Sequence, residues 1–189
     1  NINLVNPTHY LRHIIGAMEI YRPRVPVVYN THGYETLEAL RLADEITDVW
    51  LTDLKFIDSA LAARYTARAD YSKFALPAVK FMAQKPFTMR EDGKILSGCI
   101  VRHLVLPLAA YDSVNVVKFV SELPKDVIFS LMSQYTPFGE IEKYPELKRR
   151  ITHREYDRVE AAVRSSGLKN VYLQGFESAE ELYIPRWEF

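Results

Sequence analysis

Cysteine is nearly absent from this sequence, since Cys99 is the only one among 189 residues. A single cysteine excludes an intrachain disulfide and any cluster held by thiolates of this chain alone. We therefore expect a protein of the reducing cytoplasm. Cys99 lies within an apolar run, which indicates a core residue.

Net charge and long apolar segments are missing as well. The 24 basic residues balance 24 acidic ones, so no overall field favours nucleic acid or an anionic membrane, and we expect neither as a partner. No run approaches the ~18 apolar residues of a membrane span. The motifs G-x-G-x-x-G and G-x-x-x-x-G-K-[ST] are absent, which removes support for a dinucleotide or P-loop site.

What is present is the composition of an ordinary globular protein. With 48% hydrophobic and 25% charged residues, the chain can form one sizeable core. We predict one domain over residues 1–174 and a C-terminal tail over 175–189, packed by Trp187 and Phe189. The chain begins without Met and inside an apolar alternation, Asn1–Val5, so we expect a fragment of a longer protein.

Strand-like and helix-like patterns alternate along the chain. The helical patterns run near residues 10–22, 37–40, 58–82 with a break at 68–71, 112–123 and 152–167. Strands are predicted over 1–5, 25–30, 49–56, 99–107, 127–135 and 171–174. This rhythm predicts an α/β fold with parallel strands and right-handed crossovers, an open or closed TIM-like (βα) barrel.

Local signals mark several boundaries. Glu91-Asp92-Gly93 between apolar runs predicts an inserted β-hairpin. Asp112 or Ser113 is expected to cap the helix that follows the fourth strand. The segment Thr152–Glu155 reads as a capping box that opens the last helix, and Gly167 ends it.

The third strand, over 49–56, ends in opposite charges. Side chains alternate across a strand, so Val49, Leu51, Asp53 and Lys55 are expected on one face. A carboxylate and an ammonium are costly in a core unless water, a ligand or each other satisfies them. Two interpretations stay open, a structural ion pair and the functional end of a barrel strand.

Other polar residues follow the predicted strands or lie within them, as Arg102 does in the fourth strand and Gln134 does late in the fifth. If the strands are parallel, all of these side chains converge on one rim. Each has a plain structural alternative: building a turn, capping a helix, bonding a backbone group or pairing with a helix carboxylate. The residues are Thr8 and His9, Asn30 to His32, Asp53 and Lys55, Arg102, and Gln134.

Three chemistries could use such a rim. His9, His32, His103 and Asp53 could ligate a divalent ion for hydrolysis. Lys55 could form a Schiff base, although a neighbouring carboxylate opposes the lowered pKa that this needs. The rim could instead bind a zwitterionic, ribose-containing ligand, for which the following residues offer carboxylate, cationic and amide groups: Asp53, Lys55, Arg102, Asn30 and Gln134.

Five ordered motifs resemble the radical S-adenosylmethionine superfamily, specifically proteins similar to pyruvate formate-lyase activating enzyme. They are Asn1–Val5 with Pro7-Thr8-His9, Tyr29–Tyr34, Asp53-Leu54-Lys55, Val101–Pro107 and Ser130–Tyr135. The resemblance implies a partial βα barrel that binds S-adenosylmethionine at its strand ends beside a four-iron four-sulfur cluster. It also implies a 5′-deoxyadenosyl radical that abstracts hydrogen, in activating enzymes from a glycine of a partner glycyl-radical enzyme.

The resemblance also assigns residues. Asn30, Asp53, Lys55 and Arg102 look like cofactor contacts, with Gln134 in the candidate set. Thr8 and His9 occupy the loop that usually meets the methionyl amino group.

One departure from the family pattern is large. The C-x-x-x-C-x-x-C motif after the first barrel strand has no counterpart, because the chain starts at what looks like the second strand. We therefore expect an N-terminally truncated barrel, the C-terminal part of an oxidoreductase whose cluster ligands lie upstream, and no radical chemistry by this chain alone. Leu108-Ala109-Ala110 also replaces the glycine-containing turn usual after the arginine strand.

Two alternatives and one consequence remain. The chain could be a non-catalytic barrel module that binds a nucleoside-like ligand or a protein partner, or it could be a metal-dependent barrel hydrolase. Truncation of the barrel removes a strand, so we also expect an exposed sheet edge near Asn1–Val5 that favours self-association.

Overall fold

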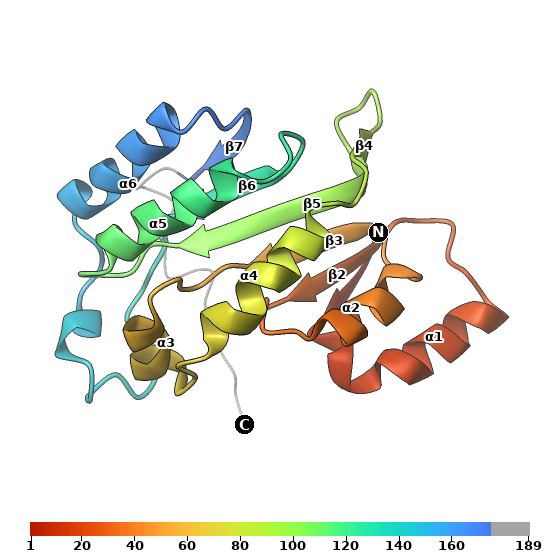
Figure 1. The fold of residues 1–189 in the computed structure, drawn as a ribbon, viewed down its shortest axis with the longest axis horizontal. Coiled ribbons are helices and arrows are strands. Elements are labelled where there is room, and N and C mark those ends of the chain that lie inside the picture. The colour runs from red at the N-terminus through yellow and green to blue at the C-terminus, as the bar shows by residue number, and fades with distance from the viewer. Residues whose placement is uncertain (175–189) are drawn as a thin grey trace.

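The computed structural model describes residues 1–174 and shows an open, mainly parallel sheet with helices in front of it (Figure 1). The order is β1-β2-β3-β5-β6-β7, and β4 pairs antiparallel with β5. Sequential parallel order confirms the predicted partial (βα) barrel. The strands are β1 Ile2–Val5, β2 Val27–Thr31, β3 Val49–Asp53, β4 Thr88–Met89, β5 Ile95–Leu104, β6 Ile128–Met132 and β7 Asn170–Leu173.

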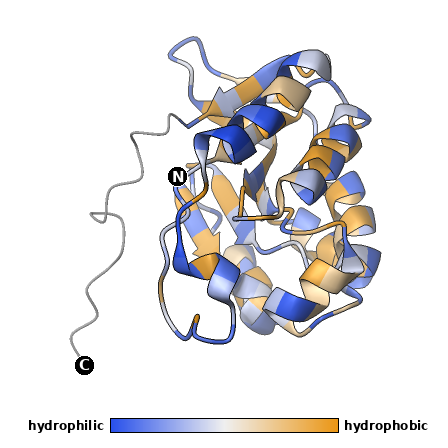
Figure 2. Ribbon diagram, turned by 90° about the vertical axis from the view of Figure 1, so that its left-hand side faces the viewer, coloured by the Kyte–Doolittle hydropathy of each residue, from blue (hydrophilic) through white to orange (hydrophobic). Residues whose placement is uncertain are grey.

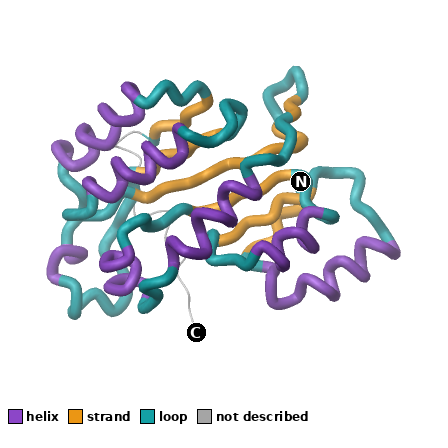
Figure 3. The backbone as a smooth tube through the Cα atoms, in the orientation of Figure 1, coloured by secondary structure: helices purple, strands orange, loops and turns teal. Residues whose placement is uncertain are grey.

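Helices connect the parallel strands. They are α1 Leu11–Ile20, α2 Leu37–Asp44, α3 Ser59–Thr66, α4 Tyr71–Met82, α5 Ala110–Ser121 and α6 His153–Ser165, with 3-10 helices η1 Pro7–Tyr10 and η2 Pro145–Lys148. Figure 3 shows the long loop between β6 and α6, which contains η2. No helix of the described residues is long and apolar enough to cross a membrane.

The core lies between the sheet and the helices. Tyr29, Trp50 and Phe129 are at most 1% exposed, and the rings of Tyr29 and Trp50 lie 4.9 Å apart on neighbouring strands. Figure 2 shows hydrophobic segments where helices and strands face each other. Alternate residues such as Leu51 and Ile100 are only half-buried, so the opposite face of the sheet is open.

The strand β3 is shorter than expected, ending at Asp53 instead of residue 56. The Leu54 N–H still donates to the carbonyl oxygen of Arg102 at 2.9 Å. The Lys55 N–H donates instead to the hydroxyl of Tyr71 at 3.0 Å. The prediction that Lys55 lies within the strand was therefore wrong, because its backbone N–H bonds the Tyr71 side chain of α4 and not the neighbouring strand.

The predicted hairpin is present, but its return strand and the fourth predicted strand are one continuous strand, β5. Gly98 lies within it at φ +142°, where an added Cβ would come 2.9 Å from the Phe87 ring. Cys99 is 2% exposed, as expected of a core residue. Burial raises the pKa of its thiol to about 12.

The helix ends test the predicted caps. The capping box at Thr152 is formed with Glu155, and Gly167 adopts φ +74° just past α6. The cap predicted for α5 was wrong, since the helix begins at Ala110 and its N-cap is Ala109. The carboxylate of Asp112 instead accepts hydrogen bonds from the backbone N–H groups of residues 57 and 58. The Ser113 hydroxyl bonds Nε2 of His103. The predicted tail, with Trp187 and Phe189, lies outside the described residues.

Candidate functional site

Four side chains meet at the carboxyl ends of β2, β3 and β5. The Arg102 guanidinium donates from Nε to Asp53 Oδ1 at 2.9 Å and from Nη2 to Asn30 Oδ1 at 2.9 Å. Lys55 Nζ lies 3.1 Å from the other carboxylate oxygen of Asp53. We call these four residues the Arg102 network.

Strand register explains why they meet. Asp53 lies directly opposite Arg102, and Asn30 lies opposite Leu51, two residues before Asp53. Residues two apart share a face, so all three side chains project from the open face of the sheet. The side chains of Asp53, Arg102 and Lys55 are 22%, 29% and 41% exposed, which leaves them accessible to a ligand.

The network retains hydrogen-bonding capacity. A guanidinium has five N–H donors, and among residues 1–174 the Nη1 atom of Arg102 has no protein acceptor. Asp53 balances one of the two cations around it, so the network carries one formal positive charge. A ligand anion would offset that charge, while hydroxyl or ammonium groups could share the Asp53 carboxylate.

A cavity of about 440 Å³ opens beside the network. One side is polar, formed by Asp53, Lys55 and Arg102, and much of the remainder is apolar or aromatic. A charged end beside an apolar wall is typical of a site for a small amphipathic molecule. The other lining residues are Leu54, Phe56, Tyr65, Thr66, Leu104, Leu106 and Met132.

The strand ends below the network are fixed by close contacts. Gly33 adopts φ +80°, and a Cβ there would come 2.5 Å from the backbone oxygen of Asp53, so only glycine fits. The Tyr71 hydroxyl donates to the His32 carbonyl at 2.9 Å while accepting from the Lys55 N–H. Burial raises the pKa of Tyr71. Sequence reasoning found no signal for Tyr71, which lies where the helical pattern breaks.

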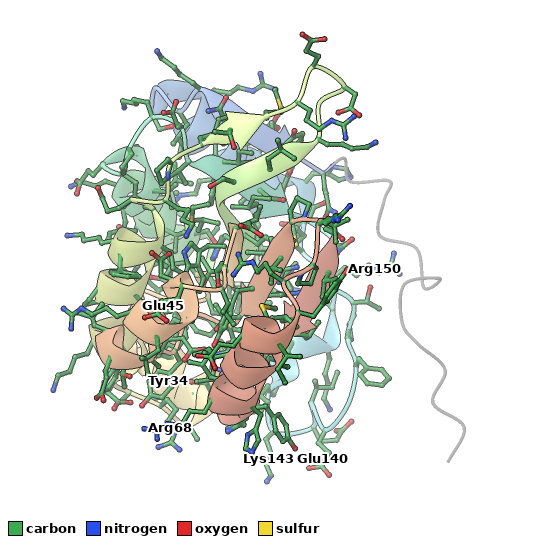
Figure 4. All side chains as sticks on the ribbon, turned by 90° about the vertical axis from the view of Figure 1, so that its right-hand side faces the viewer. Tyr34, Glu45, Arg68, Glu140, Lys143 and Arg150 are labelled. Carbon is green, nitrogen blue, oxygen red and sulfur yellow. The ribbon has the colours of Figure 1, made fainter. Side chains whose placement is uncertain are left out.

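Tyr34 closes the outer side of this region. Its ring stacks on Tyr71 with the centroids 6.2 Å apart, and its hydroxyl donates to Asp70 Oδ2 at 3.1 Å. Figure 4 shows Tyr34 and Arg68 close together at the surface. The turn after β2 is therefore braced against the start of α4.

Thr8 and His9 are not brought to the network. The Thr8 hydroxyl donates to Glu35 Oε1 at 2.7 Å, and Thr31 donates to the same oxygen at 2.7 Å. Tyr29, on the helix side of β2, bonds the Thr8 hydroxyl at 2.9 Å, so Thr8 belongs to a cluster on the helix-covered face of the sheet. Glu35 is 7% exposed, and sequence reasoning missed it.

His9 is exposed and lines a separate hollow of about 330 Å³ between α1 and α2. Gln134 is half-buried and lies two residues beyond the end of β6. The β6 residue opposite Arg102 is Ser130. Across the part of the chain that the structure describes, no hydrogen bond or ion pair joins His9 or Gln134 to the network.

The metal and Schiff-base alternatives find little support. Residues 1–174 contain no group of three or more His, Cys, Asp or Glu side chains placed to hold a metal ion. His103 is 3% exposed and bonded on both ring nitrogens, and His32 Nδ1 accepts from the Tyr34 N–H at 3.2 Å. Lys55 is 41% exposed and paired with Asp53, unlike the desolvated amine that a Schiff base needs.

Comparison with known proteins places the fold. No protein-family model matches the chain. A crystal structure of a domain of pyruvate-formate lyase-activating enzyme from Bacteroides vulgatus is similar, with a TM-score of 0.65 at 13% identity, covering 92% of this chain and 98% of that one. At this identity the likeness shows the fold alone, an open partial (βα) barrel.

One curated relative is similar in sequence. The uncharacterized protein MJ0674 of Methanocaldococcus jannaschii is 26% identical over 175 residues, which are 91% of this chain and 48% of that protein. The chain thus spans about half the length of the curated relative it matches.

Proposed function

We propose that this chain is part of a radical S-adenosylmethionine enzyme, an oxidoreductase similar to pyruvate formate-lyase activating enzyme. We further propose that the Arg102 network binds S-adenosylmethionine. The observation that carries the proposal is the network itself, which opens onto a cavity at the strand ends of a fold shared with a domain of an activating enzyme.

The residues present fit this ligand chemically. S-adenosylmethionine combines an amino-acid zwitterion, a ribose and an adenine. Its carboxylate suits Lys55 and the Nη1 of Arg102, which has no acceptor within residues 1–174, while Asp53 suits its ammonium or ribose hydroxyls. Phe56 and Leu106 supply apolar surface for the adenine. When bound beside a reduced cluster, this cofactor supplies hydrogen-atom abstraction, and the residues here would bind and orient it.

The cluster does not fit the described residues. Cys99 is the chain's one cysteine, and it is buried with a raised pKa. The ligands of a four-iron four-sulfur cluster would have to come from elsewhere, so we assign no step of the reaction to this part of the site. By the same resemblance, we propose a glycyl-radical enzyme as the partner.

The longer reading frame tests the enzymatic assignment. A C-x-x-x-C-x-x-C motif upstream of Asn1 would support it. A complete frame without that motif would favour the alternative of a non-catalytic module that binds a nucleoside-like ligand or a protein.

Ligand affinity tests the binding assignment. We expect S-adenosylhomocysteine, titrated into ¹⁵N-labelled protein, to shift amide signals at the rim. The change Arg102→Lys keeps a positive charge but loses the planar fork that joins Asn30 and Asp53. It should weaken binding about tenfold, the equivalent of one strong hydrogen bond.

The matched control is Arg90→Lys, at an exposed arginine of the β4–β5 hairpin. This change should leave the affinity unaltered. Shifts confined to other surfaces, or equal affinities for the two variants, would contradict the assignment of the Arg102 network as the binding site.

A further inference from the structure

The strand β5 holds the end of β3 from both faces of the sheet. On the open face, the Arg102 side chain bonds Asp53. Between the strands, the Leu54 N–H donates to the Arg102 carbonyl at 2.9 Å. On the helix face, His103 Nδ1 lies 2.7 Å from the Leu54 carbonyl oxygen. Arg102 and His103 of β5 thus make three hydrogen bonds to the two residues 53 and 54 at the end of β3.

The contacts of His103 determine its tautomer. The Leu54 carbonyl can only accept, so the hydrogen lies on Nδ1 of the ring. Burial lowers the pKa of His103 to about 4, which keeps the ring neutral. Nε2 must then accept, and Ser113 Oγ, 2.8 Å away in the first turn of α5, donates to it. The helix α5 therefore sets the orientation of the ring.

Neighbouring contacts show that the segment 54–58 is held as a unit. The buried Asp112 carboxylate accepts from the Ile57 N–H at 3.0 Å and from the Asp58 N–H at 2.9 Å. The Tyr71 hydroxyl accepts from the Lys55 N–H. Buried side chains of β5, α5 and α4 thus fix the backbone from the helix side, while the Lys55 side chain reaches Asp53 on the open face.

We propose that His103 is a positioning residue for the Arg102 network. Its Nδ1–H holds the Leu54 carbonyl, which fixes the backbone between Asp53 and Lys55, and the Ser113 hydroxyl holds the other side of the ring by donating to Nε2. The geometric part of this proposal stands on the contacts alone. Its consequence for ligand affinity rests on the proposed function.

The tautomer is the first test. ¹⁵N spectra of the His103 ring near neutral pH should show hydrogen on Nδ1 and none on Nε2. Ser113→Ala removes the donor to Nε2 with a small change in volume. Because the Leu54 carbonyl still accepts from the ring, the hydrogen should stay on Nδ1, while the Nε2 resonance should move as its hydrogen bond is lost. A ring with hydrogen on Nε2 in the unaltered protein, or an Nε2 resonance that Ser113→Ala leaves unchanged, would overturn the proposal.

The second test compares two substitutions of His103. The amide nitrogen of His103→Asn can occupy the place of Nδ1 and donate to Leu54, whereas His103→Leu cannot. The readouts are the Arg102 Nε–H resonance and the affinity for S-adenosylhomocysteine. We expect His103→Leu to move the resonance and weaken binding about tenfold. His103→Asn should return the resonance to its original position and bring the affinity back to within about threefold of the unaltered protein.

The outcomes separate this proposal from the proposed function. If the unaltered protein does not bind S-adenosylhomocysteine but the Arg102 resonance still moves in His103→Leu and returns in His103→Asn, the ligand assignment fails and the positioning role stands. If all three proteins agree in both readouts, the positioning role fails. Should His103→Leu not fold, the same resonance is measured in Ser113→Ala, where an unchanged signal is the contrary result.

Discussion

At the scale of single residues, Asp53 is the carboxylate that holds the candidate site together, because it pairs with both Arg102 and Lys55. Asp53→Asn would leave a partly buried arginine and an exposed lysine beside a neutral neighbour. We expect it to lower the free energy of unfolding by about 1–2 kcal/mol, measured by urea denaturation.

The control is Asp92→Asn in the β4–β5 hairpin, where the carboxylate also pairs with two cations, Arg90 and Lys94. These two ion pairs are exposed, so their loss should lower the free energy of unfolding by less than about 0.5 kcal/mol. Equal losses at positions 53 and 92 would show that the Arg102 network is an ordinary surface ion pair.

A second residue prediction concerns the end of α3. Ala67 adopts φ +56° at the C-cap, in the left-handed region that favours glycine. Ala67→Gly should raise the free energy of unfolding by about 0.5 kcal/mol, since relief of the left-handed strain exceeds the added chain entropy. Ala63→Gly, within the same helix, should lower it by about 1 kcal/mol. The opposite order of stability would contradict this account of the helix end.

The residues of the network could be found from sequence because their types and their places near the carboxyl ends of strands both carry information. Asn30, Asp53 and Arg102 lie at strand ends that parallel pairing aligns. Thr8 also follows a strand, but its hydroxyl donates to Glu35 on the helix-covered face of the sheet. A short motif does not determine on which face of the sheet a loop side chain lies, because that depends on hydrogen-bond partners far away in the chain.

At the scale of elements, the capping box of α6 has a pH signature. Hydrogen bonds from Arg149, foremost, lower the pKa of Glu155 to about 2 from 4.5. A carboxylate with a lowered folded-state pKa stabilises the protein above its unfolded value of about 4.5, and that contribution is lost as the pH falls toward 2.

Glu155→Gln should therefore destabilise the protein near neutral pH, on the order of 1–2 kcal/mol. The difference from the unaltered protein should shrink as the pH falls through this window, as urea denaturation at several pH values would show. Glu160→Gln, at an exposed pair on the same helix, should change little. A constant difference across the acid range would refute the linkage.

Element types could be predicted because apolar periodicity is local, whereas several boundaries depend on distant contacts. Asp112 resembles a helix cap in sequence, yet the backbone of Ile57 and Asp58 uses its carboxylate. The hairpin and the fourth strand looked separate because Gly98 interrupts the apolar run, while in the fold it allows the close approach of Phe87. Local pattern cannot reveal either requirement.

At the scale of the whole molecule, β1 is one edge of the described sheet. The N–H groups of Ile2 and Asn6 bond the β2 side, so those of Asn3 and Val5 point outward along a parallel strand. Val5 is 63% exposed. We expect this unprotected edge to pair with a second copy of the chain.

Asn3→Pro would remove one N–H group that points outward, and no hydrogen bond from β1 to β2 would be lost. Proline is tolerated at a sheet edge. Size-exclusion chromatography over a range of concentrations should show self-association of the unaltered protein and its loss in this variant. A clean monomer at high concentration for the unaltered protein would count against the edge as an interface.

The location of bound ligand tests the central claim most directly. A crystal structure of this chain with S-adenosylhomocysteine should show the ligand in the cavity beside Arg102, with polar atoms within hydrogen-bond distance of Asp53 and Lys55. Ligand seated instead in the hollow beside His9, with the Arg102 network untouched, would contradict the account.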